Sequence, residues 1–154
     1  MCEKTESLRR YEENVMGEVK IPIWMENAFD RERYLTHELR EDQIRSIEAR
    51  VLVDTDATML ALPQEMVERL GLRIRGQVIV TYADERKEER PRAGIVTVRV
   101  GDRDTDVDCV VGPPNSEPLL GQIVLEAMDL LVDCVQQRLV PRSESPFLPL
   151  LKMK

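Results

Sequence analysis

The chain has 154 residues, 42% of them hydrophobic and 33% charged, which is typical of one globular domain rather than of a disordered segment. Its formal net charge of −7 argues against nucleic acid as a partner, because duplex binding needs a basic face. No apolar run approaches the ~20 residues that span a bilayer, and the polar N-terminus lacks a signal-peptide core, so we expect a cytoplasmic protein with no membrane partner.

The chain divides into a domain of residues 16–141 flanked by two short segments. Residues 1–15 are polar with few apolar positions, and we interpret them as an N-terminal extension. From 17 to 27 apolar and polar side chains alternate, which predicts a strand, and Pro22 favours an edge position for it. The strongly charged stretch 28–43 predicts a solvated loop or a short helix.

The next strand, over residues 44–54, ends in a carboxylate. A carboxylate at the end of a buried strand costs free energy unless the side chain is paired or functional, so Asp54 is a candidate for catalysis. The alternative is a structural aspartate that satisfies turn amides. Pro63 then suits the first turn of a short helix, which Gly71 ends.

The second half of the domain predicts further short strands. Strands over 77–83 and 95–100 flank the charged stretch 84–92, which indicates a protruding hairpin with a solvated tip. Another strand ends before residue 112, a helix follows at 122–128, and a last hairpin precedes the irregular tail 142–154. Many short strands with one or two short helices favour a mostly β fold, a closed antiparallel barrel.

Apart from Asp54, the residue types that bind metals or attack substrates form no recognisable site pattern. Three cysteines at wide spacing and a lone histidine form neither a zinc signature nor a supported catalytic pair, and we interpret Cys109 and Cys134 as buried reduced thiols. The acidic stretch 102–108 lacks the glycine and final glutamate of a calcium loop. We expect Asp129 and Asp133 to be turn or surface acids. No metal and no cofactor is predicted.

Two separated segments resemble the retropepsin-like (retroviral-type) aspartic protease family. Residues 51–63 are similar to the strand and loop that carry the catalytic aspartate, with Asp-Thr-Asp in place of Asp-Thr-Gly. Residues 119–121, Leu-Leu-Gly, followed by a helix and by residues 131–133, are similar to the segment that packs beside that loop. The charged hairpin lies where the flap of the family would be. The resemblance covers residues 17–140 and is greatest to small single-domain bacterial members.

The resemblance implies an aspartic-type endopeptidase with a barrel of the retropepsin-like type. A chain with one aspartate loop would act as a homodimer that shares one site and binds a polypeptide substrate. The residue roles that follow from the resemblance are a catalytic Asp54, dyad support by Thr55, Asp56 and Ala57, flap contacts to substrate by Tyr82, Ala83, Asp84 and Glu85, and packing beside the catalytic loop by Leu119, Leu120 and Gly121.

Asp56 is the main departure from the family pattern. The glycine that it replaces keeps the backbone close to the dyad and allows a conformation that side chains resist. An extra carboxylate from each subunit near the shared proton would disfavour ionisation, so we expect weakened proteolysis. The alternative function is a non-catalytic dimeric module on the same fold that binds peptides or serves assembly.

Overall fold

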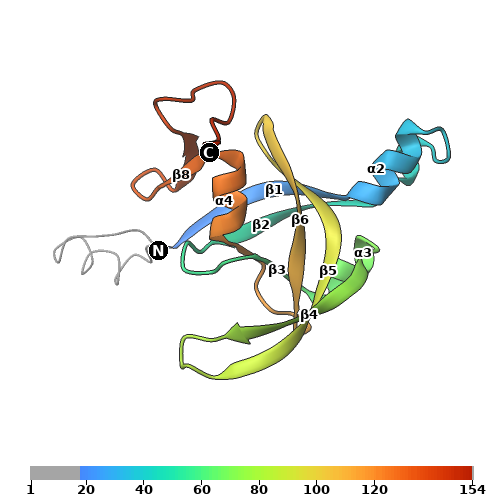
Figure 1. The fold of residues 1–154 in the computed structure, drawn as a ribbon, viewed down its shortest axis with the longest axis horizontal. Coiled ribbons are helices and arrows are strands. Elements are labelled where there is room, and N and C mark those ends of the chain that lie inside the picture. Colours follow the sequence, from blue (N-terminus) through green and yellow to red (C-terminus); the bar gives the residue numbers. More distant parts are fainter. Residues whose placement is uncertain (1–17, 154) are drawn as a thin grey trace.

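The computed structural model describes residues 18–153, and these form nine strands and four short helical segments (Figure 1). The predicted extension over residues 1–15 lies outside the described residues. The helical segments are α2 (Ala28–Leu35), the 3-10 turn η1 (Glu41–Gln43), α3 (Gln64–Arg69) and α4 (Gln122–Met128). The strands are β1 (Val19–Asn27), β2 (Ser46–Val53), β3 (Leu60–Pro63), β4 (Arg73–Thr81), β5 (Lys87–Val100), β6 (Arg103–Gly112), β7 (Leu119–Leu120), β8 (Leu130–Asp133) and β9 (Arg138–Pro141).

Seven of these strands form one sheet in the order β1-β2-β7-β3-β6-β5-β4, and β1 also pairs with β5. The predicted mostly β fold with short helices is confirmed, and closure into a barrel stays a prediction. Most ladders are antiparallel as expected, but two, β2–β7 and β3–β6, are parallel. Because β7 runs antiparallel to β3 but parallel to β2, it lies between two strands of opposite direction and must be parallel to one of them.

The alternation predicted for the first strand is confirmed by burial in β1. Val19, Ile21 and Ile23 are buried, whereas Lys20 and Pro22 are exposed. The β1–β5 pairs begin only at Trp24, so Pro22 lies in the half of β1 that pairs with β2 alone. This position suits a residue without an N–H, because no second ladder there requires one.

A single apolar core supports the strands that lead to the candidate site. Its buried side chains come from every strand of the main sheet except β4 and from two helices, so the hydrophobic effect fixes β2, β7 and α4 relative to one another. Among them are Met25, Val51, Leu60, Leu62, Leu70, Val98, Leu120, Val124 and Met128.

The charged stretch after β1 forms α2 and η1, which confirms the prediction of a short helix with solvated connections. Asn27 caps α2 by accepting a hydrogen bond from the Asp30 amide at 3.1 Å. The buried Asp30 carboxylate accepts three bonds from Arg45, from its amide at 3.0 Å and its guanidinium at 2.8 and 2.9 Å. The Arg45 side chain holds the Asp30 pKa below its ordinary value. This ion pair fastens α2 to the start of β2.

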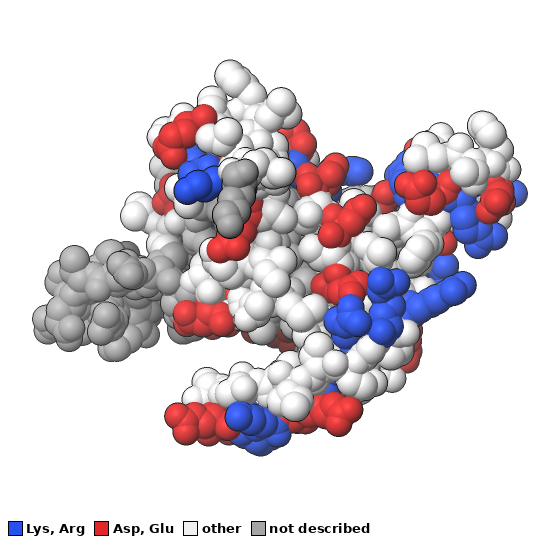
Figure 2. Space-filling model, in the orientation of Figure 1, with Lys and Arg blue, Asp and Glu red and all other residues white. Residues whose placement is uncertain are grey.

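The predicted protruding hairpin is formed by β4 and β5, and it extends from the body of the molecule as an arm (Figures 1 and 2). Its strands are longer than expected, because β5 already begins at Lys87 and includes most of the charged stretch 84–92. Charged side chains are compatible with this strand because the arm is exposed to solvent over much of its length. β4 forms the end of the sheet order and pairs with β5.

The C-terminal part confirms the last helix, the last hairpin and the irregular tail. Strands β8 and β9 form a separate two-stranded sheet, and residues 142–153 form no helix or strand. Cys109 is buried and free as predicted, but Cys134 is half-buried in the turn after β8 and disulfide-bonded, so the thiol prediction is wrong there. Within residues 18–153, no helix combines the length and apolar character needed to cross a membrane.

Candidate active site

Asp54 directly follows β2, and the neighbouring strand β7 sets the position of its backbone. The amide of Leu52 donates to the carbonyl of Pro118 at 3.0 Å, and the amide of Asp54 donates to the carbonyl of Leu120 at 3.0 Å. The ladder to β7 thus continues one residue past the end of β2. Val51 and Val53 are buried on one face of the strand, whereas Asp54 is half-buried. The chain therefore delivers a carboxylate to the rim of the core.

The loop after β2 closes into a tight turn around the carboxylate. The amide of Ala57 donates to the main-chain carbonyl of Asp54 at 3.1 Å. The amide of Asp56 donates to Oδ1 of the Asp54 side chain at 3.0 Å. Asp54 therefore has the turn-stabilising contact expected of a structural aspartate, and this same contact fixes the orientation of its carboxylate. Thr55 lies half-buried within the turn.

The N-terminus of α4 holds the other half of this loop. The amides of Gln122 and Ile123 donate to the carbonyls of Ala57 and Thr58, at 2.8 and 3.0 Å. These are amide groups of the first helical turn, which have no partner within the helix. The loop carbonyls supply that partner. Sequence reasoning did not identify these two residues, since their contribution is made by the main chain.

Gly121 permits this close approach because it has no side chain. A Cβ at this position would lie 2.4 Å from the carbonyl oxygen of Met59 and 2.8 Å from that of Ala57. The backbone of Gly121 is extended, with φ −91° and ψ 179°, so the requirement is steric rather than conformational. Residues 119–121 thus lie directly beside the loop that carries Asp54.

Asp56 is exposed and has an ordinary backbone conformation. Positive φ values at non-glycine residues occur at His37, Glu85, Asn115, Asp129 and Gln137, and not at Asp56. The expectation that position 56 needs a conformation that side chains resist is therefore wrong. The turn at 54–57 is accessible to any L-residue.

The four predicted flap residues lie at the tip of the β4–β5 arm. The tip is a compact turn, with Tyr82 N–H donating to Arg86 at 2.8 Å and the Arg86 guanidinium 4.4 Å from the Tyr82 ring centre. Tyr82 is half-buried, and residues 83–85 are exposed. The arm and the 54–59 loop project to the same side of the molecule (Figure 1), and Figure 2 shows an open hollow between the arm and the body. The tip of the arm does not cover the 54–59 loop in this structure.

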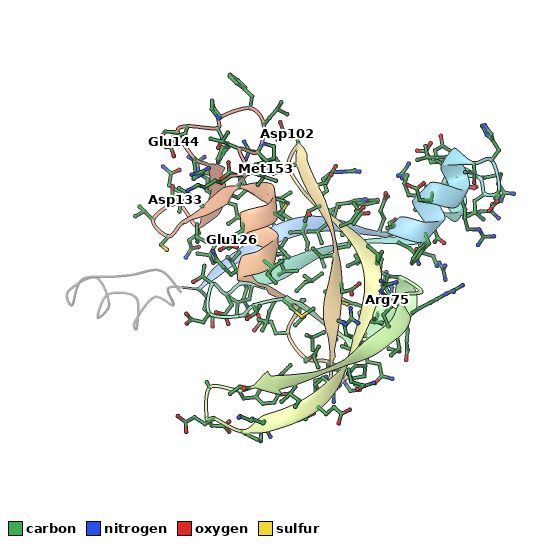
Figure 3. The ribbon with its side chains drawn as sticks, viewed as in Figure 1. Arg75, Asp102, Glu126, Asp133, Glu144 and Met153 are labelled. Atoms are coloured by element: carbon green, nitrogen blue, oxygen red, sulfur yellow. The ribbon has the colours of Figure 1, made fainter. Side chains whose placement is uncertain are left out.

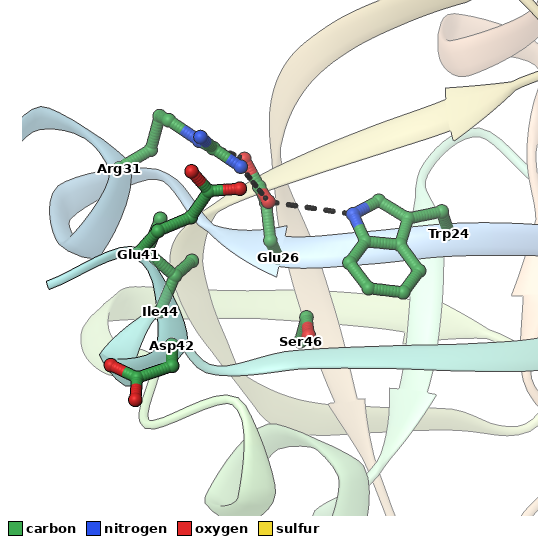
Figure 4. A pocket seen from close by; sticks show the side chains of 7 residues that line it. All are labelled: Trp24, Glu26, Arg31, Glu41, Asp42, Ile44 and Ser46. Carbon is green, nitrogen blue, oxygen red and sulfur yellow. Dashed lines mark hydrogen bonds and ion pairs between the residues drawn. The ribbon is translucent and has the colours of Figure 1, made fainter. Parts of the chain in front are cut away.

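A second concave site, of about 460 Å³, lies at the opposite end of the body beside α2 and η1 (Figure 4). Its floor carries Glu26, whose buried carboxylate accepts bonds from Arg31 at 2.8 and 2.9 Å and from the Trp24 indole at 3.4 Å. Arg31 lowers the pKa of Glu26. Because these charges satisfy one another, we interpret this cluster as structural.

The sequence predicts both Asp133 and Asp129 to be turn or surface acids. Asp133 is a turn residue as predicted, accepting bonds from the amides of Val135 and Gln136 at 3.1 and 3.0 Å. Asp129 is also a turn residue as predicted, between α4 and β8, but its side chain is buried and bonded to the tail. Its partners are 13 to 21 residues away in sequence, so no local pattern indicated them. Within residues 18–153, no group of three or more histidine, cysteine or acidic side chains is placed to hold a metal.

Comparison with known proteins identifies the family. Residues 42–127, more than half of the chain, match the family described as "gag-polyprotein putative aspartyl protease". The chain belongs to this family. The matched region includes the Asp54 loop, the β4–β5 arm and most of α4.

The fold agrees with this assignment. The EIAV protease, solved in complex with the inhibitor HBY-793, superposes on this aspartyl protease family member with a TM-score of 0.51. The superposition covers 73% of this chain and 89% of the other, at 17% sequence identity. At this identity the likeness concerns the fold. A search of curated proteins finds no match to the chain.

Proposed function

We propose that this protein is an aspartic-type endopeptidase in which Asp54 pairs with the Asp54 of the partner subunit across a homodimer. The observation that carries the proposal is the fixation of the Asp54 loop from both sides, by β7 and by the N-terminus of α4. Membership in the family and the retroviral protease fold support the same conclusion. One chain contributes one such loop, so a two-fold dimer is the simplest way to bring two carboxylates together.

The chemistry follows from two carboxylates that lie close together and share one proton. The ionised carboxylate takes a proton from water, whose oxygen attacks the peptide carbonyl, while the protonated partner donates to the carbonyl oxygen. The first carboxylate, now protonated, then donates its proton to the peptide nitrogen while the second, now ionised, takes a proton from a hydroxyl of the tetrahedral intermediate. The C–N bond breaks, the two peptide products leave, and the pair again shares one proton. The bond from Asp56 N–H to Oδ1 orients one oxygen of each Asp54 for this exchange. We assign to Thr55 the role of joining the two loops across the dimer axis.

The β4–β5 arm would complete the site on the substrate side. An extended peptide fits the hollow between arm and body, where Tyr82 and residues 83–85 would close over it as a flap. The substrate class is therefore an exposed or unfolded polypeptide segment rather than a folded surface.

Asp56 supports a second candidate function, a dimer that binds extended peptides without cleaving them. Its exposed side chain adds one acidic group per subunit in the loop of Asp54. This charge opposes ionisation of the shared site, so we propose activity below that of a glycine-containing relative.

Cleavage of an unfolded protein from acidic to neutral pH tests the proposal with the parent chain and Asp54→Asn. We expect cleavage by the parent and none by the variant. Mixing equal amounts of both and allowing exchange adds a test of the shared site. If both subunits must supply Asp54, about a quarter of the parent activity per subunit pair remains, rather than about a half for independent subunits. Peptide binding without cleavage by the parent would favour the second candidate.

A further inference from the structure

Helix α4 is held at its C-terminal end as well as at the end that contacts the Asp54 loop. Nη1 of Arg103, at the start of β6, donates to the carbonyls of Met128 and Asp129 at 2.9 and 2.8 Å. These carbonyls are at the end of the helix, where no later turn can satisfy them. Arg103 is only 3% exposed, so this is a guanidinium taken almost completely out of water to serve one helix end.

The C-terminal tail, from residue 142 on, contacts the same end of α4. Asp129, 8% exposed, accepts bonds from the Arg142 guanidinium at 2.5 Å, the Ser145 hydroxyl at 2.5 Å and the Leu150 amide at 2.8 Å. Nη2 of Arg103 also donates to the carbonyl of Ser145. The donors from Arg142 and Ser145 hold the pKa of Asp129 well below its ordinary range. Figure 3 shows this tail, near Glu144 and Met153, above the helix that carries Glu126.

Hydrophobic burial does not explain why the tail is held in place. Its large apolar side chains stay exposed, with Phe147 at 81%, Leu148 at 77% and Met153 at 87%. Fixing the backbone of each residue costs about 1–2 kcal/mol of conformational entropy. The polar contacts of Arg103 and Asp129 therefore help to offset this cost, and those of Asp129 lie at the C-terminal end of α4.

We propose that Arg103, Asp129, Arg142 and Ser145 form a latch that positions the Asp54 loop through α4. The helix has seven residues, about 10 Å, and both of its ends are bonded to other segments. A displacement of its C-terminal end consequently moves the Gln122 and Ile123 amides that hold Ala57 and Thr58. Asp129 and Arg142 are positioning residues in this scheme. Its consequence for catalysis rests on the proposed function, whereas the mechanical coupling does not.

The test compares Asp129→Asn with Asp30→Asn as a matched control. Both aspartates are buried, each accepts three hydrogen bonds, and each pairs with an arginine, but Asp30 lies in α2 at the other end of the body. Asparagine tolerates the left-handed backbone of Asp129, where φ is 56°. Arg142→Gln serves as a milder second variant if Asp129→Asn does not fold.

The first readout is amide hydrogen exchange in the folded protein, which needs no enzymatic activity. Release of the latch should speed exchange of the Gln122 and Ile123 amides about tenfold, by local opening, while Asp30→Asn leaves them unchanged. The second readout is cleavage of an unfolded protein, for which Asp129→Asn should lower kcat with little change in KM. Unchanged exchange at these amides, or equal acceleration in the control, would overturn the latch. An inactive parent would overturn the proposed function instead and leave the exchange result to decide the latch.

Discussion

Replacing Gly121 by alanine should displace the Asp54 loop by an amount that the structure defines. The new Cβ would lie 2.4 Å from the Met59 carbonyl oxygen, whereas ordinary contact begins near 3.4 Å. The neighbours are main-chain atoms and cannot rotate away, so the loop must retreat by about 1 Å. That movement stretches the Gln122–Ala57 and Ile123–Thr58 hydrogen bonds, now 2.8 and 3.0 Å, beyond normal range.

The cost can be built from these changes. Each lost hydrogen bond is worth about 1 kcal/mol net, and overpacking strain adds about 1–3 kcal/mol. The sum of these terms predicts that Gly121→Ala reduces the free energy of unfolding by about 3–5 kcal/mol. If the variant still folds, we expect it not to cleave an unfolded protein.

Urea denaturation followed by circular dichroism measures the stability, and Gly101→Ala is the control. A Cβ on Gly101 meets nothing within 4 Å, but its φ of +60° disfavours alanine, so we expect a loss of about 1 kcal/mol there. Equal losses for the two variants, or a Gly121→Ala protein as stable as the parent, would refute the steric argument for residues 119–121.

Three further outcomes follow from other sites. Asp56→Gly should keep the fold, since position 56 is exposed and has no positive φ. We expect this variant to cleave an unfolded protein faster than the parent, and equal rates would show that the extra carboxylate does not affect cleavage. The pKa of Asp30 is lowered in the fold, so the stabilisation that its carboxylate provides is present above the ordinary pKa of about 4 and is lost as pH falls below it. Between about pH 6 and 3 the urea midpoint should therefore fall less steeply for Asp30→Asn than for the parent, and parallel slopes would contradict this. Burial raises the pKa of the Cys109 thiol to about 12, so peptide mapping should find it alkylated at neutral pH only after unfolding.

Local pattern was sufficient for the elements whose residues interact with their near neighbours. Alternating burial identified β1, and apolar residues at helical spacing identified α4 with its observed bounds. Gly71 ends the helix that follows Pro63, and its φ of +64° is the reason that glycine suits this position. Asp54 and Gly121 were identified from the resemblance of two short segments to one family, and in the structure Asp54 follows β2 while Gly121 is the N-cap of α4.

Only the tertiary structure decided how those segments meet. The insertion of β7 beside β2 sets the Asp54 backbone, and the Asp56 backbone proved ordinary only once the turn was formed. No local pattern indicated that Arg103 and Asp129 are buried at the end of α4 and bonded to the tail. Sequence patterns report periodicity and turn chemistry among adjacent residues. Contacts between residues tens of positions apart depend instead on how the core packs, and those contacts hold the candidate site.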